Sequence, residues 1–179
     1  MHYFFEKFGG VAKILFVLVG LCLVLVQGER LMAQEPHACD YLLPAMVEEV
    51  MGMPVLEVES KEANPLGQSV CFFKLSNTEM YLAQVQMMCS SWPGMENKKW
   101  TAKSLFENNM SFLDNLEEEQ GLGDQAYWAG SELRLGTGLH VLADDCFFTI
   151  LALAGGDEAI NRAKARELAV KVLGMLGKE

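Results

Sequence analysis

The sequence lacks the short motifs by which catalytic and metal-binding sites are usually recognised. None of its five cysteines stands in a Cys-x-x-Cys pair, the spacing that zinc ribbons and thioredoxin-like redox sites use. A Gly-x-Ser-x-Gly nucleophile elbow and a Gly-rich phosphate loop are absent as well. We therefore expect a protein that is not an enzyme and that holds no cofactor and no metal ion.

Basic residues are also scarce. The 179-residue chain has 14 Lys and Arg against 24 Asp and Glu, a formal net charge of −10. Because nucleic acids and anionic lipid surfaces are bound through Lys and Arg, this charge argues against both as partners. It favours a neutral or cationic partner instead.

The N-terminal segment has the three parts of a secretory signal. Two lysines precede an apolar run over residues 14–26, and a short polar stretch follows it. Cleavage after Ala33 would remove residues 1–33 and leave one exported domain, 34–179, in the periplasm or outside the cell. The alternative is an uncleaved anchor over residues 11–27, although a spanning helix needs about 20 apolar residues. Contact with a membrane would then occur only through this segment.

Hydrophobic periodicity and turn residues divide the rest of the chain into helices and strands. Pro44 near the start and Gly52 at the end predict a first helix over 40–52, and an extended segment with a loop follows over 53–68. Asp157 is a plausible N-cap for the last helix, which Gly177 can end. The expected middle helix is 100–116, and the expected strands are 69–75, 80–89, 125–129, 132–135, 139–143 and 146–154.

This order predicts an α+β fold. The strands follow one another through short turns without crossover helices, which excludes parallel βαβ winding. We expect an antiparallel sheet flanked by helices, and the order suggests two similar halves, each a helix followed by strands. The glutamates 117–119, together with Asp114, lack the Asp-x-Asp-x-Asp-Gly spacing of a calcium loop, and we interpret them as a solvated helix end.

An oxidising compartment would allow the four cysteines beyond the leader to form two structural disulfides. They are Cys39, Cys71, Cys89 and Cys146, and four cysteines allow three pairings. Cys89 ends one expected strand and Cys146 begins another. The two come within bridging range if these strands are antiparallel neighbours.

Four short segments carry a resemblance to a known family. They are 39–43 (Cys-Asp-Tyr-Leu-Leu), 49–52 (Glu-Val-Met-Gly), 71–73 (Cys-Phe-Phe) and 121–128 (Gly-Leu-Gly-Asp-Gln-Ala-Tyr-Trp). In these segments the chain resembles a group of secreted bacterial domains that includes lipoproteins of unknown function and the PknH-like extracellular sensor domain.

The resemblance implies an exported α+β binding or sensing module with no catalytic residues to transfer. It also implies that Cys39 pairs with Cys71, which leaves Cys89 to pair with Cys146. The chain departs from the family in three respects: neither Cys22 nor Cys39 has the context of a lipidation site, no kinase domain is present, and the second cysteine pair has no clear counterpart.

The segment 121–128 is the candidate ligand-binding site. Gly121 and Gly123 permit positive φ angles or a close approach of the backbone, and Asp124 can accept from backbone amides two residues on. Tyr127 and Trp128 would point to opposite faces of a strand. A turn that sets the strand and packs one aromatic, or a ligand-binding lip, are both consistent with this pattern.

Two functions follow as hypotheses. The favoured one is a non-catalytic extracytoplasmic module, sensor-like, that binds a small molecule, an envelope component or a protein partner. The alternative is a hydrolase or metal-handling protein whose site assembles only in three dimensions. For that enzyme, His140 would pair with Asp144 or Asp145 and a nucleophile, so a polar pocket joining His140, an acidic residue and a hydroxyl favours it. A closed core with one apolar groove favours binding.

Overall fold

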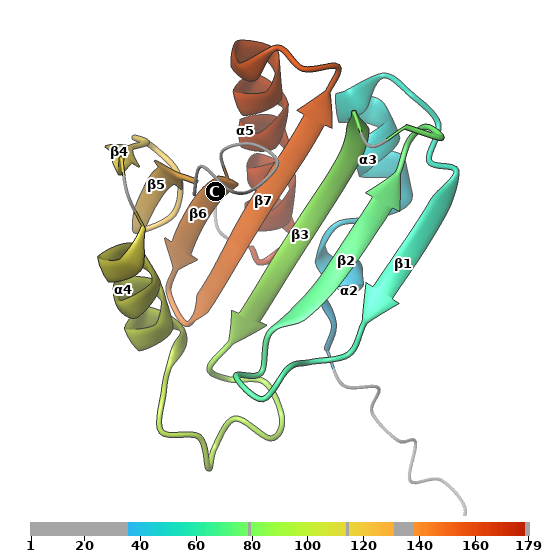
Figure 1. The fold of residues 1–179 in the computed structure, drawn as a ribbon. Helices are drawn as coiled ribbons and strands as arrows, with labels where there is room; N and C mark the ends of the chain where they lie inside the picture. The colour runs from blue at the N-terminus through green and yellow to red at the C-terminus, as the bar shows by residue number, and fades with distance from the viewer. Residues whose placement is uncertain (1–35, 79, 114, 131–137, 178–179) are drawn as a thin grey trace, which may run out of the picture. The chain divides into compact units, whose positions relative to one another are not determined.

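Seven strands form one antiparallel sheet in the order β1-β2-β3-β7-β6-β5-β4 (Figure 1). The computed structural model describes residues 36–78, 80–113, 115–130 and 138–177. The predicted leader 1–33 and the predicted strand 132–135 therefore lie outside the described residues. The strands are β1 (Glu57–Lys61), β2 (Ser69–Lys74), β3 (Tyr81–Cys89), β4 (Glu117–Glu118), β5 (Gln125–Ala129), β6 (Gly138–Ala143) and β7 (Cys146–Ala154).

The described helices lie on both faces of this sheet. They are α2 (Ala38–Tyr41), α3 (Pro44–Met51), α4 (Ala102–Phe112) and α5 (Glu158–Met175). In Figure 1, α2, α3 and α5 lie behind the sheet, and we call this side the helical face. The predicted α+β fold with helices flanking an antiparallel sheet is confirmed.

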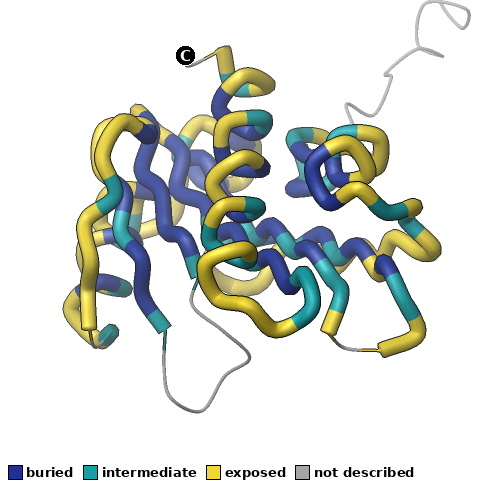
Figure 2. The backbone as a smooth tube through the Cα atoms, turned by 90° about the horizontal axis from the view of Figure 1, so that it is seen from above, coloured by how far each residue is buried: buried dark blue, intermediate teal, exposed yellow. Residues whose placement is uncertain are grey.

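The core lies mainly on the helical face, between the sheet and the helices that cover it. α5 buries five apolar side chains there, and alternate residues of β6 and β7 meet them because successive strand residues point to opposite faces. Figure 2 shows buried residues running along the central strands and on the inner sides of the helices. The α5 residues are Ala165, Leu168, Ala169, Val172 and Leu173.

α4 packs on the opposite face of the sheet. Phe106 of α4 meets the ring of Phe147 on β7 edge-on, with the ring centroids 5.5 Å apart, and the ring of Tyr127 on β5 at 6.1 Å. It covers the part of this face formed by β5, β6 and β7. Among the described residues, no helix covers the part formed by β3 and β2. We call this whole side of the sheet, including the part under α4, the open face.

The first predicted helix is two helices. Leu42 and Leu43 both have extended backbone, with ψ angles of 104° and 151°, so the chain leaves helical geometry before Pro44. This break has a physical cause, because a residue that precedes proline is pushed out of the helical region. Pro44 and Gly52 bound α3 as predicted: Gly52 is left-handed at φ 69° and donates its N–H to the carbonyl of Glu48.

Other boundaries differ because of local hydrogen bonding. α4 begins after Thr101, whose hydroxyl accepts from the amide of Ser104, and it ends at Phe112, so it is shorter than predicted. The expected solvated helix end was wrong, because Glu117–Glu118 form a strand that pairs with β5. The predicted N-cap is confirmed: Asp157 accepts from the amides of Ala159 and Ile160.

The two halves of the chain share an order but not a helix arrangement. Each half starts with a helix and continues as a meander that runs from an edge of the sheet to its centre, where β3 meets β7. These two central strands pair over their whole length, from Tyr81 opposite Ala154 to Cys89 opposite Cys146. The helices of the first half cover the helical face, whereas α4 lies on the open face.

Both edges of the sheet are short or polar. All five residues of β1 are exposed, and its carboxylates lie near lysines: Glu57 is 3.7 Å from Lys74 and Glu59 is 3.5 Å from Lys61. β4 at the other edge has two residues.

The structure contains both predicted disulfides. Cys39–Cys71 joins α2 to β2, and Cys89–Cys146 joins the two central strands directly across the ladder. Two disulfides indicate an oxidising, extracytoplasmic compartment. Within the described part of the chain, no helix has the length and apolarity to cross a membrane.

Removal of either disulfide should destabilise the fold. The bridged residues are separated by 32 positions for Cys39–Cys71 and by 57 for Cys89–Cys146. Loop closure in the unfolded chain then predicts a loss of roughly 4 kcal/mol for each paired Cys→Ser double variant. Urea unfolding followed by circular dichroism measures this loss, and a double variant as stable as the wild type would show that its bridge does not constrain the unfolded chain.

Candidate functional site

The predicted glycine turn is a close backbone contact between β5 and β6. Gly121 and Gly123 both have left-handed backbone, at φ 75° and 55°. A Cβ atom on Gly123 would lie 2.5 Å from the carbonyl oxygen of Leu142, so only glycine fits there. We expected Asp124 to accept from a backbone amide two residues on. Its carboxylate instead accepts from the amide of Asp144, 2.6 Å away.

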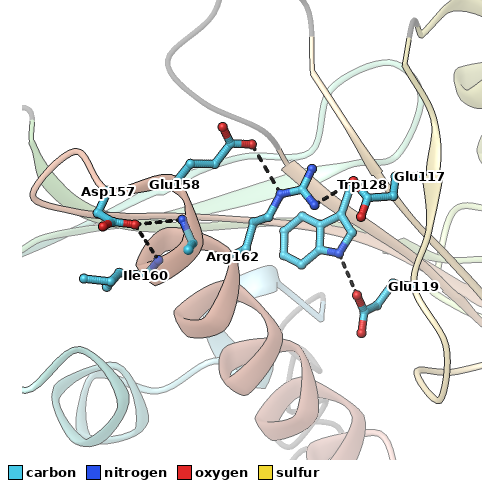
Figure 3. Close-up of polar contacts among 8 residues, drawn as sticks. Glu117, Glu119, Trp128, Asp157, Glu158, Ile160 and Arg162 are labelled. Carbon is cyan, nitrogen blue, oxygen red and sulfur yellow. Dashed lines mark hydrogen bonds and ion pairs between the residues drawn. The ribbon is translucent and has the colours of Figure 1, made fainter.

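The two aromatics that follow point to opposite faces, as predicted. Trp128 is 3% exposed on the helical face, where the guanidinium of Arg162 lies 5.0 Å from its ring and its Nε1–H donates to Glu119 at 2.7 Å (Figure 3). Arg162 also forms ion pairs with Glu117 at 2.7 Å and Glu158 at 3.3 Å. The indole is therefore held between α5 and the β4 edge.

Glu119 completes this contact on the β4 side. Burial acts to raise the pKa of Glu119, but the hydrogen bonds from Trp128 and Arg166 and the positive charges of Arg166 and Arg162 outweigh it. The pKa of this carboxyl therefore lies below its ordinary value, and the group stays ionised at neutral pH.

These contacts give the segment 121–128 a structural role. The indole of Trp128 has almost no surface to offer a ligand, and Tyr127 is half-buried against Phe106 of α4. Gly123 and Asp124 make the backbone contact with Leu142 that leads into β5, whereas Gly121 supplies only a left-handed turn residue. The five predicted residues do not form one site, because the side chains of Tyr127 and Trp128 lie on opposite faces of the sheet.

A groove lies elsewhere, on the open face beside α4. Its volume is about 760 Å³. The floor consists of two rungs of the sheet, because the register places Gln86 opposite Thr149 and Thr149 opposite His140 in one rung. Gln84 opposite Leu151 forms the next rung.

The walls of the groove come from two segments outside the sheet. One wall is α4, and the other is the loop before β2. Gly138 at the start of β6 leaves space in the groove above Thr149 and His140. A Cβ there would lie 3.3 Å from Thr149 and 3.5 Å from Nε2 of His140. The further lining residues are Leu66, Gln68, Leu105, Asn108, Asn109, Phe112, Leu113, Ala129, Gly130 and Phe147.

The described residues that line the groove include no Asp, Glu, Lys or Arg. Its polar groups are instead carboxamides, one hydroxyl and one imidazole. The carboxamides belong to Gln68, Gln84, Gln86, Asn108 and Asn109, and we call the site the amide groove.

His140 is the one titratable side chain among them. It is 8% exposed, and its Nδ1 lies 3.0 Å from the hydroxyl of Thr149 and 3.5 Å from the amide nitrogen of Asn109. Its other nitrogen is left to donate to the carbonyl of Ala129. Burial lowers the pKa of His140 to about 4, which the bond to Ala129 only partly offsets. At neutral pH the imidazole is uncharged and both of its nitrogens are engaged.

The two aspartates predicted to pair with His140, Asp144 and Asp145, lie in the β6–β7 turn, and two of their hydrogen bonds lead elsewhere. The amide of Asp144 donates to Asp124, and Asp145 accepts from the amide of Ser91 at 3.1 Å. Neither contact involves His140. Among the described residues there is no cluster of three or more His, Cys, Asp or Glu side chains that could hold a metal ion.

Sequence reasoning identified one residue of the amide groove, His140, and did not identify the groove. A partial signal was present, because Gln84 and Gln86 alternate with buried residues along β3 and mark a wetter face. What makes them a site is their position beside Thr149 and under α4. That position depends on the pairing of strands far apart in the sequence.

Comparisons with protein-family models, curated proteins and solved structures return no match for this chain. The resemblance to PknH-like sensor domains therefore stays a prediction from short segments.

Alanine at Gly123 should destabilise the fold more than alanine at Gly121. Both positions are left-handed, but only a Cβ on Gly123 meets the backbone, and nothing lies within 4 Å of one on Gly121. We expect a loss of roughly 3 kcal/mol for Gly123→Ala and about 1 kcal/mol for Gly121→Ala. Urea unfolding gives both values, and equal losses would contradict the close contact with Leu142.

Acidification should destabilise the wild type more than His140→Gln. The folded state holds His140 neutral down to a pKa of about 4, whereas the unfolded chain takes up the proton near 6.5. Between these values the unfolded state binds more protons, so stability falls as the pH decreases, by on the order of 2–3 kcal/mol. Unfolding curves at several pH values from 7 to 4 compare the two proteins, and parallel pH profiles would contradict the burial of a neutral imidazole.

Proposed function

We propose that this protein is a non-catalytic, extracytoplasmic binding module that takes an uncharged ligand in the amide groove. The observation that carries this proposal is the groove itself. Its volume of about 760 Å³ falls within the roughly 300–1,000 Å³ typical of small-molecule sites. Polar side chains sit half-buried in it, at Gln84, Gln86 and Thr149.

The chemistry of the lining supports an uncharged ligand. A charged group that leaves water needs an opposite charge or several hydrogen bonds to offset the cost of desolvation. The described lining residues supply no opposite charge, because they include no Asp, Glu, Lys or Arg and His140 is neutral. Carboxamides offer both donors and acceptors, so they match a ligand whose groups are polar and neutral.

The state of His140 supports binding over catalysis. A general base works best when its pKa lies near the operating pH and when a nitrogen is free to take a proton. The pKa of His140 is about 4, and its two nitrogens face Thr149 and Ala129. The expected constellation of His140, an acidic residue and a hydroxyl lacks its acidic member among the described lining residues.

The compartment and the resemblance agree with this function. Both disulfides indicate an oxidising location, where many small domains bind ligands or partners. The predicted similarity to PknH-like sensor domains implies the same class of function. That resemblance carries no catalytic residues to transfer to this chain.

Small neutral fragments should bind the amide groove in preference to charged ones. We expect N-methylacetamide to shift the side-chain amide resonances of Gln84, Gln86 and Asn109 in ¹H–¹⁵N spectra. These shifts should level off as the concentration of N-methylacetamide rises, as for a single binding site. Acetate and methylammonium should not shift these resonances, because the described lining residues offer no opposite charge. Shifts scattered over the surface, or saturation at another site, would contradict the proposal.

Two variants locate the binding in the groove. Gln86→Glu places a charge on the floor, and Gly138→Ala adds a methyl group 3.3 Å from Thr149, so each should weaken N-methylacetamide roughly tenfold. The matched control is Gln125→Glu, since Gln125 is exposed on β5 and does not line the groove. Turnover of a hydrolase substrate panel that is lost in His140→Ala would favour the enzyme instead.

A further inference from the structure

We infer, on the basis of the proposed function, that the ligand of the amide groove is a short, uncharged carbohydrate. A sugar ring carries hydroxyl groups around its rim, each of them both donor and acceptor, and presents C–H groups on its faces. A site for it therefore needs neutral bidentate polar groups on one side and an apolar or aromatic surface on another. The amide groove presents both.

The floor supplies the polar groups. Gln86 and Thr149 are direct neighbours across β3 and β7, and Gln84 follows on the next rung of the same face, two residues along β3. Each carboxamide has two N–H donors and an acceptor oxygen, so each matches adjacent hydroxyls of a sugar. All three side chains are only half-buried, and they face the groove.

The aromatic surface is supplied by Phe112, the last residue of α4. Its side chain lines the groove and yet is 78% exposed, the most exposed of the large apolar residues in the described chain. Leu66 on the opposite wall is 37% exposed. An exposed phenylalanine that stands beside a row of carboxamides is explained by a ligand with one apolar face.

Two other uncharged ligands fit less well. A hydrocarbon chain would cover Gln84 and Gln86 without satisfying them, and each buried polar group left unpaired costs roughly 1–3 kcal/mol. An extended peptide is usually bound by adding a strand to a sheet edge. The groove lies over the central strands β3 and β7, whose backbone is paired on both sides.

Binding to an array of neutral mono- to tetrasaccharides tests this inference. Cellobiose and N,N′-diacetylchitobiose are measured again in solution by calorimetry, with sialyllactose as the acidic probe and a capped trialanine as the neutral peptide. We expect neutral sugars to bind, and sialyllactose and the peptide to bind at least roughly tenfold more weakly or not at all.

Variants of the groove connect the binding to its residues. Phe112→Ala and Gln86→Leu should each weaken the sugar roughly tenfold, while Phe112→Tyr keeps the ring and the affinity. The matched controls are Gln125→Leu on β5 and Leu116→Ala, which is exposed beyond α4 and does not line the groove. Phe112 is exposed, so its loss leaves the unfolding curve unchanged.

Four results would overturn the inference. Sugar affinity that is unchanged in Phe112→Ala and Gln86→Leu places the sugar outside the groove. Sialyllactose that binds as well as the neutral sugars removes the argument from the uncharged lining. A capped trialanine that binds where no sugar does identifies a peptide site. If no sugar binds while N-methylacetamide still saturates the groove, the carbohydrate is wrong and the proposed binding function stands; if N-methylacetamide fails as well, both fail.

Discussion

The antiparallel pairing of β3 with β7 is the constraint on which the rest of this structure depends. Each half of the chain is a meander that ends at the centre of the sheet, and this one ladder joins the two halves. A shift of its register by a single residue would exchange the faces of every side chain on one strand. Gln84 and Gln86 would then enter the core on the helical face, and Val85 would turn to the open face. The same register that closes the core therefore also builds the floor of the amide groove.

The two faces of the sheet have separate tasks. Both disulfides and the stack of Arg162 on Trp128 lie on the helical face, where three helices cover the strands. α4 covers only part of the open face, which leaves half-buried polar side chains beside it. An antiparallel sheet allows this division, because one of its faces can stay solvated while the other forms the core.

Local signals were sufficient for much of the fold. The last helix has its own cap, Asp157, and its own apolar repeat, and the β2–β3 hairpin has alternation and a turn between its strands. Each of these features is complete within one stretch of sequence. The break at Leu42–Leu43 was also encoded locally, by the proline that follows, but the short helix before it was merged with the next.

Features that depend on tertiary pairing were not predictable in the same way. Glu117–Glu118 form a strand only because β5 lies beside them, and a pair of glutamates alone favours a solvated end. Alternation showed that Tyr127 and Trp128 face opposite ways, but not which of them meets α5. The amide groove draws on β3, β6, β7, α4 and a loop, so no single stretch of sequence contains it.

The polar edge strand β1 has a consequence for the protein in crowded surroundings. A sheet edge exposes unpaired N–H and C=O groups to which another chain can add a strand. In β1, Glu57, Glu59 and Lys61 alternate along that edge, all of them exposed, and the opposite edge ends in a strand of two residues. A second molecule that docked on β1 would have to crowd these charged side chains, and the β4 edge offers too little length to pair with. This arrangement opposes polymerisation of the sheet through its edges.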